Sequence, residues 1–145
     1  MKTENELLQH IYQDASMATF TLTKLLENLK EKDNKIKDAT EDILKEYEQF
    51  AKTSKQLLQE QKIIPQEESM MAKMGASMGI KKEVINDNSD ASMAEMLIQG
   101  ISMGSLEMQK KIKAYEKKID EETLKLAKSF LKFQENAIEK LKKYL

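Results

Sequence analysis

Apolar residues recur at every third or fourth position along four long stretches of the chain. In the first stretch, about residues 4 to 31, this rhythm is unbroken from Leu8 to Leu29. Because an α-helix turns once in about 3.6 residues, such spacing places the apolar side chains on one face of a helix. The pattern therefore predicts an all-α fold with four long amphipathic helices, at about residues 4–31, 34–62, 90–117 and 120–144.

The junctions between these stretches predict how the helices pair. Only a few residues separate the first helix from the second and the third from the fourth. Junctions this short make each pair an antiparallel hairpin. Asp33 and Asp120 stand where the second and the last helix begin, and an aspartate there can cap free backbone amides. We therefore expect residues 1–145 to form one domain, an antiparallel four-helix bundle.

Residues 63–89 join the two hairpins and are predicted to form a long crossover. Pro65 lacks an amide donor, so it ends the second helix, and it also suits the first position of a new helix. The methionines and glycines that follow predict a short Met-rich helix that is weak unless packing holds it. The polar run from Asn86 to Asp90 predicts the loop before the third long helix.

The third long helix carries two apolar stripes instead of one. The first has the spacing of the other bundle helices, and the second lies about a third of a turn away. Two stripes need cover on two sides, so we expect the Met-rich crossover or a second subunit to cover the second one. The predicted partner is a second copy of the chain, forming a dimer, or another helical protein. The interface candidates are Met93, Met96, Gly100, Met103, Met70, Met74 and Met78.

Small and polar residues within the apolar stripes predict where helices come close. Ala15 and Ala18 leave room for a neighbouring backbone, and Gly100 with Gly104 is the candidate for that neighbour. Four polar residues interrupt the stripes, and we expect them to fix the register of the helices or to hold a water. They are Thr40, Ser54, Ser105 and Gln134.

Composition narrows the classes of function. The 24 basic residues are all lysine and nearly balance 25 acidic residues, so the net charge is −1. Without a strong positive field or arginine, the chain lacks the usual means of gripping phosphates and bases, and we expect no nucleic-acid partner. The lack of cysteine excludes disulfides and thiolate metal sites. No segment approaches the roughly 20 apolar residues of a membrane span, and the N-terminus shows no apolar leader, so we expect a soluble, cytoplasmic protein.

Three segments of the chain resemble a group of small bacterial ferritin-like proteins. They are residues 11–17, 96–104 and 134–143, which read Ile-Tyr-Gln-Asp-Ala-Ser-Met, Met-Leu-Ile-Gln-Gly-Ile-Ser-Met-Gly and Gln-Glu-Asn-Ala-Ile-Glu-Lys-Leu-Lys-Lys. Two helical hairpins joined by a long crossover are also the arrangement of ferritin-like bundles, and this similarity covers almost the whole chain. The resemblance implies a ferritin-like fold and carries no particular activity.

The same resemblance suggests a test for di-iron chemistry. Di-iron members place a glutamate on each of two helices and Glu-x-x-His on the other two, because two hard cations need bridging carboxylates and imidazoles. Glu46, Glu95 and Glu135 stand at comparable positions, whereas both histidine positions hold other residues. These glutamates are our candidate site for Fe or Mn, as an alternative to the expectation that the chain has no cofactor.

The sequence also contains features of a Cu(I) site and of a hydrolase nucleophile. The thioethers of a methionine cluster bind Cu(I), but filling an irregular core is the favoured explanation for ten methionines. Residues 75–79 and 100–104 both match Gly-x-Ser-x-Gly, the nucleophile turn of α/β-hydrolases, yet neither follows a predicted strand. His10, the only histidine, occupies an outward position on the first helix, where we expect it to be solvated.

These observations favour a non-catalytic bundle that acts as a structural or protein-interaction module. The first alternative is a metal-binding protein that uses the three glutamates or, with Cu(I), the methionines. The second alternative is a protein that holds an apolar ligand or lipid inside the bundle, and it rests on the width of the apolar stripes.

Overall fold

Five α-helices make up most of the chain in the computed structural model, which describes residues 2–145. They are α1 (Lys2–Asn28), α2 (Lys37–Glu60), α3 (Met70–Asn86), α4 (Asp90–Tyr115) and α5 (Glu121–Lys142). No strand occurs within residues 2–145, so the predicted all-α class is confirmed. In this part of the chain, no helix combines the length and the apolar character needed to cross a lipid bilayer.

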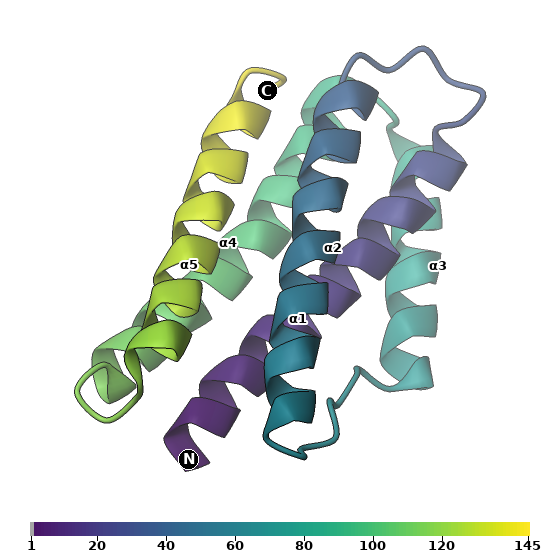
Figure 1. The fold of residues 1–145 in the computed structure, drawn as a ribbon. Coiled ribbons are helices and arrows are strands. Elements are labelled where there is room, and N and C mark those ends of the chain that lie inside the picture. The colour runs from purple at the N-terminus through teal and green to yellow at the C-terminus, as the bar shows by residue number, and fades with distance from the viewer. Residues whose placement is uncertain (1) are drawn as a thin grey trace.

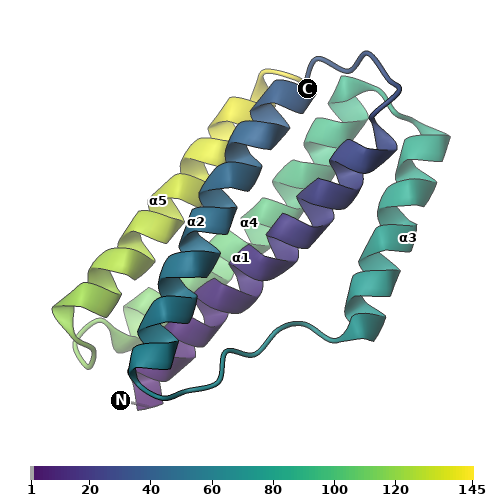
Figure 2. The same ribbon diagram turned by 45° about the vertical axis from the view of Figure 1, so that its right-hand side comes forward.

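The helices form a bundle of two pairs with one helix at its side. α1 packs along α2, and α4 packs along α5, with further contacts of α1 to α4 and of α5 to both α1 and α2. The colours in Figure 1 show that the two helices of each pair run in opposite directions. α3 lies against α1 at the edge of the bundle, on the side away from α5 (Figure 2). The chain therefore passes from the first pair to the second through residues 61–89, which include α3.

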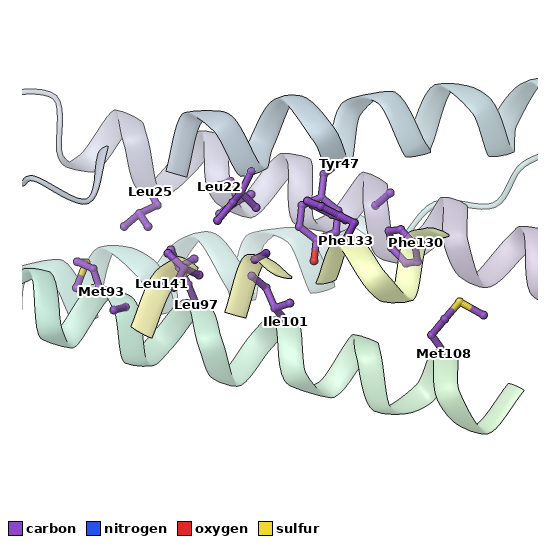
Figure 3. Close-up of a cluster of buried hydrophobic side chains, with 14 of the residues drawn as sticks. Leu22, Leu25, Tyr47, Met93, Leu97, Ile101, Met108, Phe130, Phe133 and Leu141 are labelled. Carbon is purple, nitrogen blue, oxygen red and sulfur yellow. The ribbon is translucent and has the colours of Figure 1, made fainter. Parts of the chain in front are cut away.

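An aromatic cluster joins α2 to α5. The ring of Tyr47 meets the ring of Phe133 edge to face, with 4.7 Å between centroids, and that of Phe130 at 5.9 Å. Phe50 packs on the same two phenylalanines, at 5.1 Å and 5.4 Å. Figure 3 shows Tyr47, Phe130 and Phe133 together in the core. Because aromatic pairs in such geometries add about 0.5–1.5 kcal/mol each beyond their buried area, this cluster is a major link between the two helix pairs.

The start of α2 is capped from another helix. The residue before it, Ile36, has no side-chain cap. Instead, the carboxylate of Asp90, at the start of α4, accepts hydrogen bonds from the backbone amides of Lys35 at 3.2 Å and Ile36 at 3.3 Å. The side-chain amide of Asn34 donates to the same carboxylate at 2.9 Å. The prediction that Asp33 caps this helix is therefore wrong, because a carboxylate distant in the sequence supplies the acceptors.

The Met-rich helix begins later than predicted. It starts at Met70, after Ser69, whose hydroxyl accepts a hydrogen bond from the amide of Ala72 at 3.1 Å. Pro65 is therefore not its first residue, and that prediction is wrong. A serine cap satisfies an amide that would otherwise be unpaired, which proline alone does not do.

The non-helical segment before α3 is held against α1 by one side chain. The Nε2 of Gln9 donates to the carbonyl of Ile64 at 3.0 Å, and its Oε1 accepts from the amide of Gln66 at 3.0 Å. These two bonds replace the backbone partners that a helix would have provided.

Two other predicted helix starts are confirmed. α4 begins at Asp90, after Ser89, whose hydroxyl accepts from the amide of Ser92 at 3.2 Å. α5 follows Asp120, whose carboxylate accepts from the amide of Thr123 at 2.7 Å. At both sites the capping residue adjoins its own helix, so the local sequence is sufficient to locate the start.

Replacing Asp90 with alanine should destabilise the fold by about 1–2 kcal/mol, because the cap of α2 would lose its acceptor. Urea denaturation followed by circular dichroism measures the free energy of unfolding. Asp33→Ala is the matched control, since Asp33 is exposed and does not cap α2. Its effect should stay within about 0.5 kcal/mol. Equal losses in the two variants would contradict this assignment of the cap.

Candidate functional site

A partly open cavity of about 270 Å³ lies between α1, α3 and α4. In Figure 3, Leu22 and Leu25 of α1 face Leu97 and Ile101 of α4, which are among its walls. Most of the lining is aliphatic, so a water inside would find few hydrogen-bond partners. The lining residues are Asp14, Met17, Ala18, Thr21, Leu22, Leu25, Tyr47, Ala76, Ile80, Met96, Leu97, Gly100 and Ile101.

A polar cluster from three helices lies at one end of this cavity. The Nε2 of Gln134 on α5 donates a hydrogen bond to Oδ2 of Asp14 on α1 at 2.8 Å. The same nitrogen lies 3.3 Å from the hydroxyl oxygen of Tyr47 on α2, which accepts a second bond. Gln134 is completely buried, and its Oε1 has no hydrogen-bond partner among the described residues. The cluster therefore connects α1, α2 and α5 by hydrogen bonds, and it leaves Oε1 of Gln134 able to accept a further one.

Gly104 makes room for this cluster. A Cβ atom added at Gly104 would overlap the Asp14 carboxylate and lie 2.9 Å from Nε2 of Gln134. Real side chains do not come this close unless the neighbouring atoms move. Because Gly104 of α4 has no side chain, Asp14 and Gln134 have the space to form their hydrogen bond. Gly104 therefore lets a neighbouring helix come close to α4, as predicted.

Burial controls the acidity of the cluster. It raises the pKa of Asp14 from 3.8 to about 6, and the hydrogen bond from Gln134 only partly opposes this effect. The negative charge of Glu68 raises the Asp14 pKa further. Burial also raises the pKa of Tyr47 above its usual range, with a further contribution from the charge of Asp14. Among residues 2–145, no positively charged side chain lines the cavity, so ionised Asp14 has no counter-ion there.

His10 lies one helical turn before Asp14 and is not solvated as predicted. Its ring is partly buried against the backbone of Gly104, and Nε2 has no hydrogen-bond partner in the described chain. Burial lowers its pKa, and the charge of Lys111 lowers it further. The prediction of an outward, solvated histidine is therefore wrong, because α4 covers this side of α1.

The other polar residues of the core act differently from Gln134. The hydroxyls of Thr40, Ser54 and Ser105 are buried and donate to carbonyls of their own helices, at 2.9 Å, 2.8 Å and 3.1 Å. Such bonds satisfy the hydroxyl without specifying a partner helix. Of the four polar residues predicted to fix the register, Gln134 differs from the other three because it hydrogen-bonds to side chains of other helices.

The structure does not bring the three candidate glutamates together. Glu46, Glu95 and Glu135 are all exposed on the outside of the bundle. Glu135 accepts a hydrogen bond from Nε2 of Gln109 at 3.3 Å. Within residues 2–145, no group of three or more His, Asp or Glu side chains is placed to hold a metal ion. These residues point outward because they flank the apolar stripes of their helices.

The predicted methionine interface is divided between core and surface. Met93 is completely buried, and Met96 packs against the core and lines the cavity. Met103 is exposed on α4, as are the three interface candidates of the crossover, Met70, Met74 and Met78, on α3. Met93 is therefore buried apart from the exposed methionines, and a Cu(I) site on the methionines stays an alternative prediction.

The two Gly-x-Ser-x-Gly segments lie inside α3 and α4. A nucleophile turn joins a strand to a helix, and neither segment has that context. Their glycines differ in surroundings: Gly104 is tightly packed, whereas Gly75, Gly79 and Gly100 have no atom within 4 Å of an added Cβ. The predicted role of Gly100 in close helix packing is therefore wrong, since it borders the cavity.

Sequence reasoning missed Asp14 as a site residue. Asp14 adjoins Ala15, which is buried in the core, and a charged neighbour of a core residue usually faces solvent. The available signal was Gly104, because a small residue in one bundle helix makes room for a side chain from another. Pairing Gly104 with Asp14 required knowing that these two positions of α4 and α1 lie side by side in the bundle.

Comparison of the chain with models of known protein families, with curated proteins and with solved structures found no match. The similarity to ferritin-like proteins therefore stays a prediction.

Gly104→Ala should destabilise the fold by about 1–2 kcal/mol, because a methyl group would push Asp14 away from Gln134. This loss is net of up to about 1 kcal/mol that alanine gains over glycine in a helix. Gly100→Ala is the matched control on the same helix, and it should stabilise the fold by about 0.5–1 kcal/mol. Denaturant titration of both variants gives the comparison. A similar gain in both would show that Gly104 is not tightly packed.

The raised Asp14 pKa predicts how stability depends on pH. The folded state binds a proton more tightly than the unfolded state, so this group favours folding most below pH 3.8, and that contribution is lost as the pH rises through about 6. Asp14→Asn removes the titration. The stability of the wild type relative to this variant should fall by up to about 3 kcal/mol between about pH 4 and about pH 7. His10, with its lowered pKa, is present in both proteins, so its contribution largely cancels. A constant difference across this range would refute the shift.

Proposed function

We propose that this chain is a non-catalytic helical module of ferritin-like arrangement that associates with a second copy through α3. The observation that supports this most directly is an exposed apolar face on α3. This face, called the outer α3 face, consists of Met71, Met74, Met78 and Ile85. Their exposed fractions are 84%, 61%, 69% and 77%.

α3 has two apolar faces, and the bundle covers one of them. Ile80 and Val84 are buried against the bundle, and Ala76 lines the cavity. The members of the outer α3 face are separated by three, four and seven residues, so they share one side of the helix. Ile80 lies about half a turn around the helix from Met71 and Met78, so the buried face is opposite to this one. Several large, exposed apolar side chains on one side of a surface helix are typical of an interaction site. Thioethers suit such a surface because they adapt to a partner's shape.

Two glycines strengthen the case for a partner helix. Gly75 and Gly79 lie one turn apart within α3, and neither has an atom within 4 Å of an added Cβ. Each costs the helix about 1 kcal/mol relative to alanine, and packing within the described chain does not explain that cost. A second helix that approaches the backbone closely at these positions would explain it.

The charges at the ends of α3 favour a second copy in antiparallel orientation. Glu67 and Glu68 precede the helix, and Lys81 and Lys82 lie in its last turns, all of them exposed. In a two-fold symmetric pair the acidic end of one α3 lies beside the basic end of the other. One acidic group is already engaged, since Lys73 pairs with Glu67 at 3.0 Å. The net charge of −1 adds little repulsion between copies.

The ferritin-like arrangement and the lack of catalysis are supported by separate observations. The order of two helix pairs joined by a long segment is that of ferritin-like bundles. The segments that match a nucleophile motif lie within helices, where their serines lack the turn that such chemistry uses. Binding is therefore the function that the surface of this module supports best.

Replacing Met74 and Met78 together with lysine should weaken self-association at least about a hundredfold, because two charges would have to be buried at the interface. Sedimentation velocity over a range of protein concentrations measures the dimer dissociation constant. The variant should keep its helical content, since both side chains are exposed in the single chain.

Leu145→Lys is the matched control, because Leu145 is also exposed but lies at the end of the chain, away from α3. It should leave the dissociation constant unchanged within about threefold. A wild-type protein that stays monomeric at every concentration would refute the proposal. So would a double variant that associates as tightly as the wild type.

A further inference from the structure

The cavity between α1, α3 and α4 has an unusual charge balance. Its lining contains one charged side chain, the Asp14 carboxylate, and no lysine, although the chain has 24 lysines. The other lining residues are aliphatic residues, methionine, threonine, glycine and Tyr47. An occupant of this cavity therefore meets an apolar wall and one anionic group.

The Asp14 carboxylate is only partly engaged by the protein. Among the described residues it receives one hydrogen bond, from Gln134 to Oδ2. Oδ1 is left to interact with an occupant of the cavity. Taking a carboxylate out of water without a cation is costly, and the cost is relieved when a cation binds beside it. A pKa of about 6 leaves this carboxyl largely ionised near neutral pH, so the negative charge is present when a ligand arrives.

Tyr47 adds a second recognition element at the same end. Tyr47 also lines the cavity, and the face of a tyrosine ring attracts a cation. Its hydroxyl oxygen accepts one hydrogen bond from Gln134 and has a second lone pair that can accept from an ammonium group. A group that carries positive charge therefore finds a carboxylate and an aromatic ring together.

We propose that this cavity binds a small organic amine, with its ammonium group at Asp14 and Tyr47 and its apolar body between α3 and α4. The volume of about 270 Å³ limits the ligand. A cavity of about 150 Å³ holds benzene, so by proportion this one holds a molecule of about ten non-hydrogen atoms. A compact monoamine with a hydrocarbon or aryl body meets these requirements, whereas a carboxylic acid or a phosphate is repelled by Asp14.

Gly100 offers a way to close the cavity without disturbing the polar cluster. It lies on the cavity wall, is exposed, and has no atom within 4 Å of an added Cβ. A leucine there would extend into the cavity mouth. Ala91 is a small, exposed residue of the same helix that does not line the cavity, so Ala91→Leu is the matched control.

Titration calorimetry of the full chain with 2-phenylethylamine and 2-phenylethanol tests the proposal. These probes have the same size and shape and differ in an ammonium against a hydroxyl group. The wild type should bind the amine at least about tenfold more tightly than the alcohol, since hydrogen bonds to charged groups are the stronger ones. Asp14→Asn keeps an acceptor for Gln134 but removes the charge. It should lose this preference while its affinity for the alcohol changes less than about threefold.

Two further variants locate the binding. Gly100→Leu should abolish binding of the amine, and Ala91→Leu should retain it. Amine binding that survives in Gly100→Leu would place the ligand on surface carboxylates and overturn the proposal. Equal affinity of the wild type for amine and alcohol, a preference retained in Asp14→Asn, or no binding of either probe to the wild type would each overturn it as well.

Discussion

Asp14 of α1 is held by Gln134 of α5, and the same amide nitrogen reaches Tyr47 of α2. A hydrogen bond inside an apolar core is stronger than one in water, and a missing partner there is costly. Sliding any of these three helices along the bundle would separate the partners. Gly104 adds α4 to the constraint, because its missing side chain provides the space that the carboxylate occupies. One polar cluster thus restricts the register of four helices that apolar packing alone would leave freer to shift.

The cavity and the outer α3 face both depend on α3. This helix lies at the edge of the bundle, and its inner residues close one side of the cavity while its outer methionines face solvent. Its glycines make it a weak helix by itself, so packing on α1 and the cap at Ser69 hold it in place. The two proposed binding events therefore take place on opposite sides of one helix. Association through the outer face would leave the cavity lining unchanged.

Much of the fold could be predicted from local patterns. The spacing of apolar residues identified four long helices, whose observed limits differ from the predicted ones by a few residues. The cap at Asp120 adjoins its own helix and was predicted from the chain, and the start of α4 at Asp90 agrees with the predicted limit of about residue 90. The cap of α2 could not be predicted from the local sequence, because Asp90 comes close to it only when the bundle folds. The start of α3 was misplaced at Pro65 because a proline permits a helix start without requiring one.

The sequence by itself determined the helical class, the approximate helices and the excess of apolar surface around the methionines, because these follow from periodicity and composition. Only the tertiary structure decided which of those methionines are buried, that Glu46, Glu95 and Glu135 stay apart, and that Asp14 lies in a cavity with Gln134 and Tyr47. The physical reason is that a stripe specifies the buried face of a helix but not its neighbour or its height in the bundle. Side chains at the border of a stripe, such as Asp14 and His10, are buried or exposed according to that neighbour.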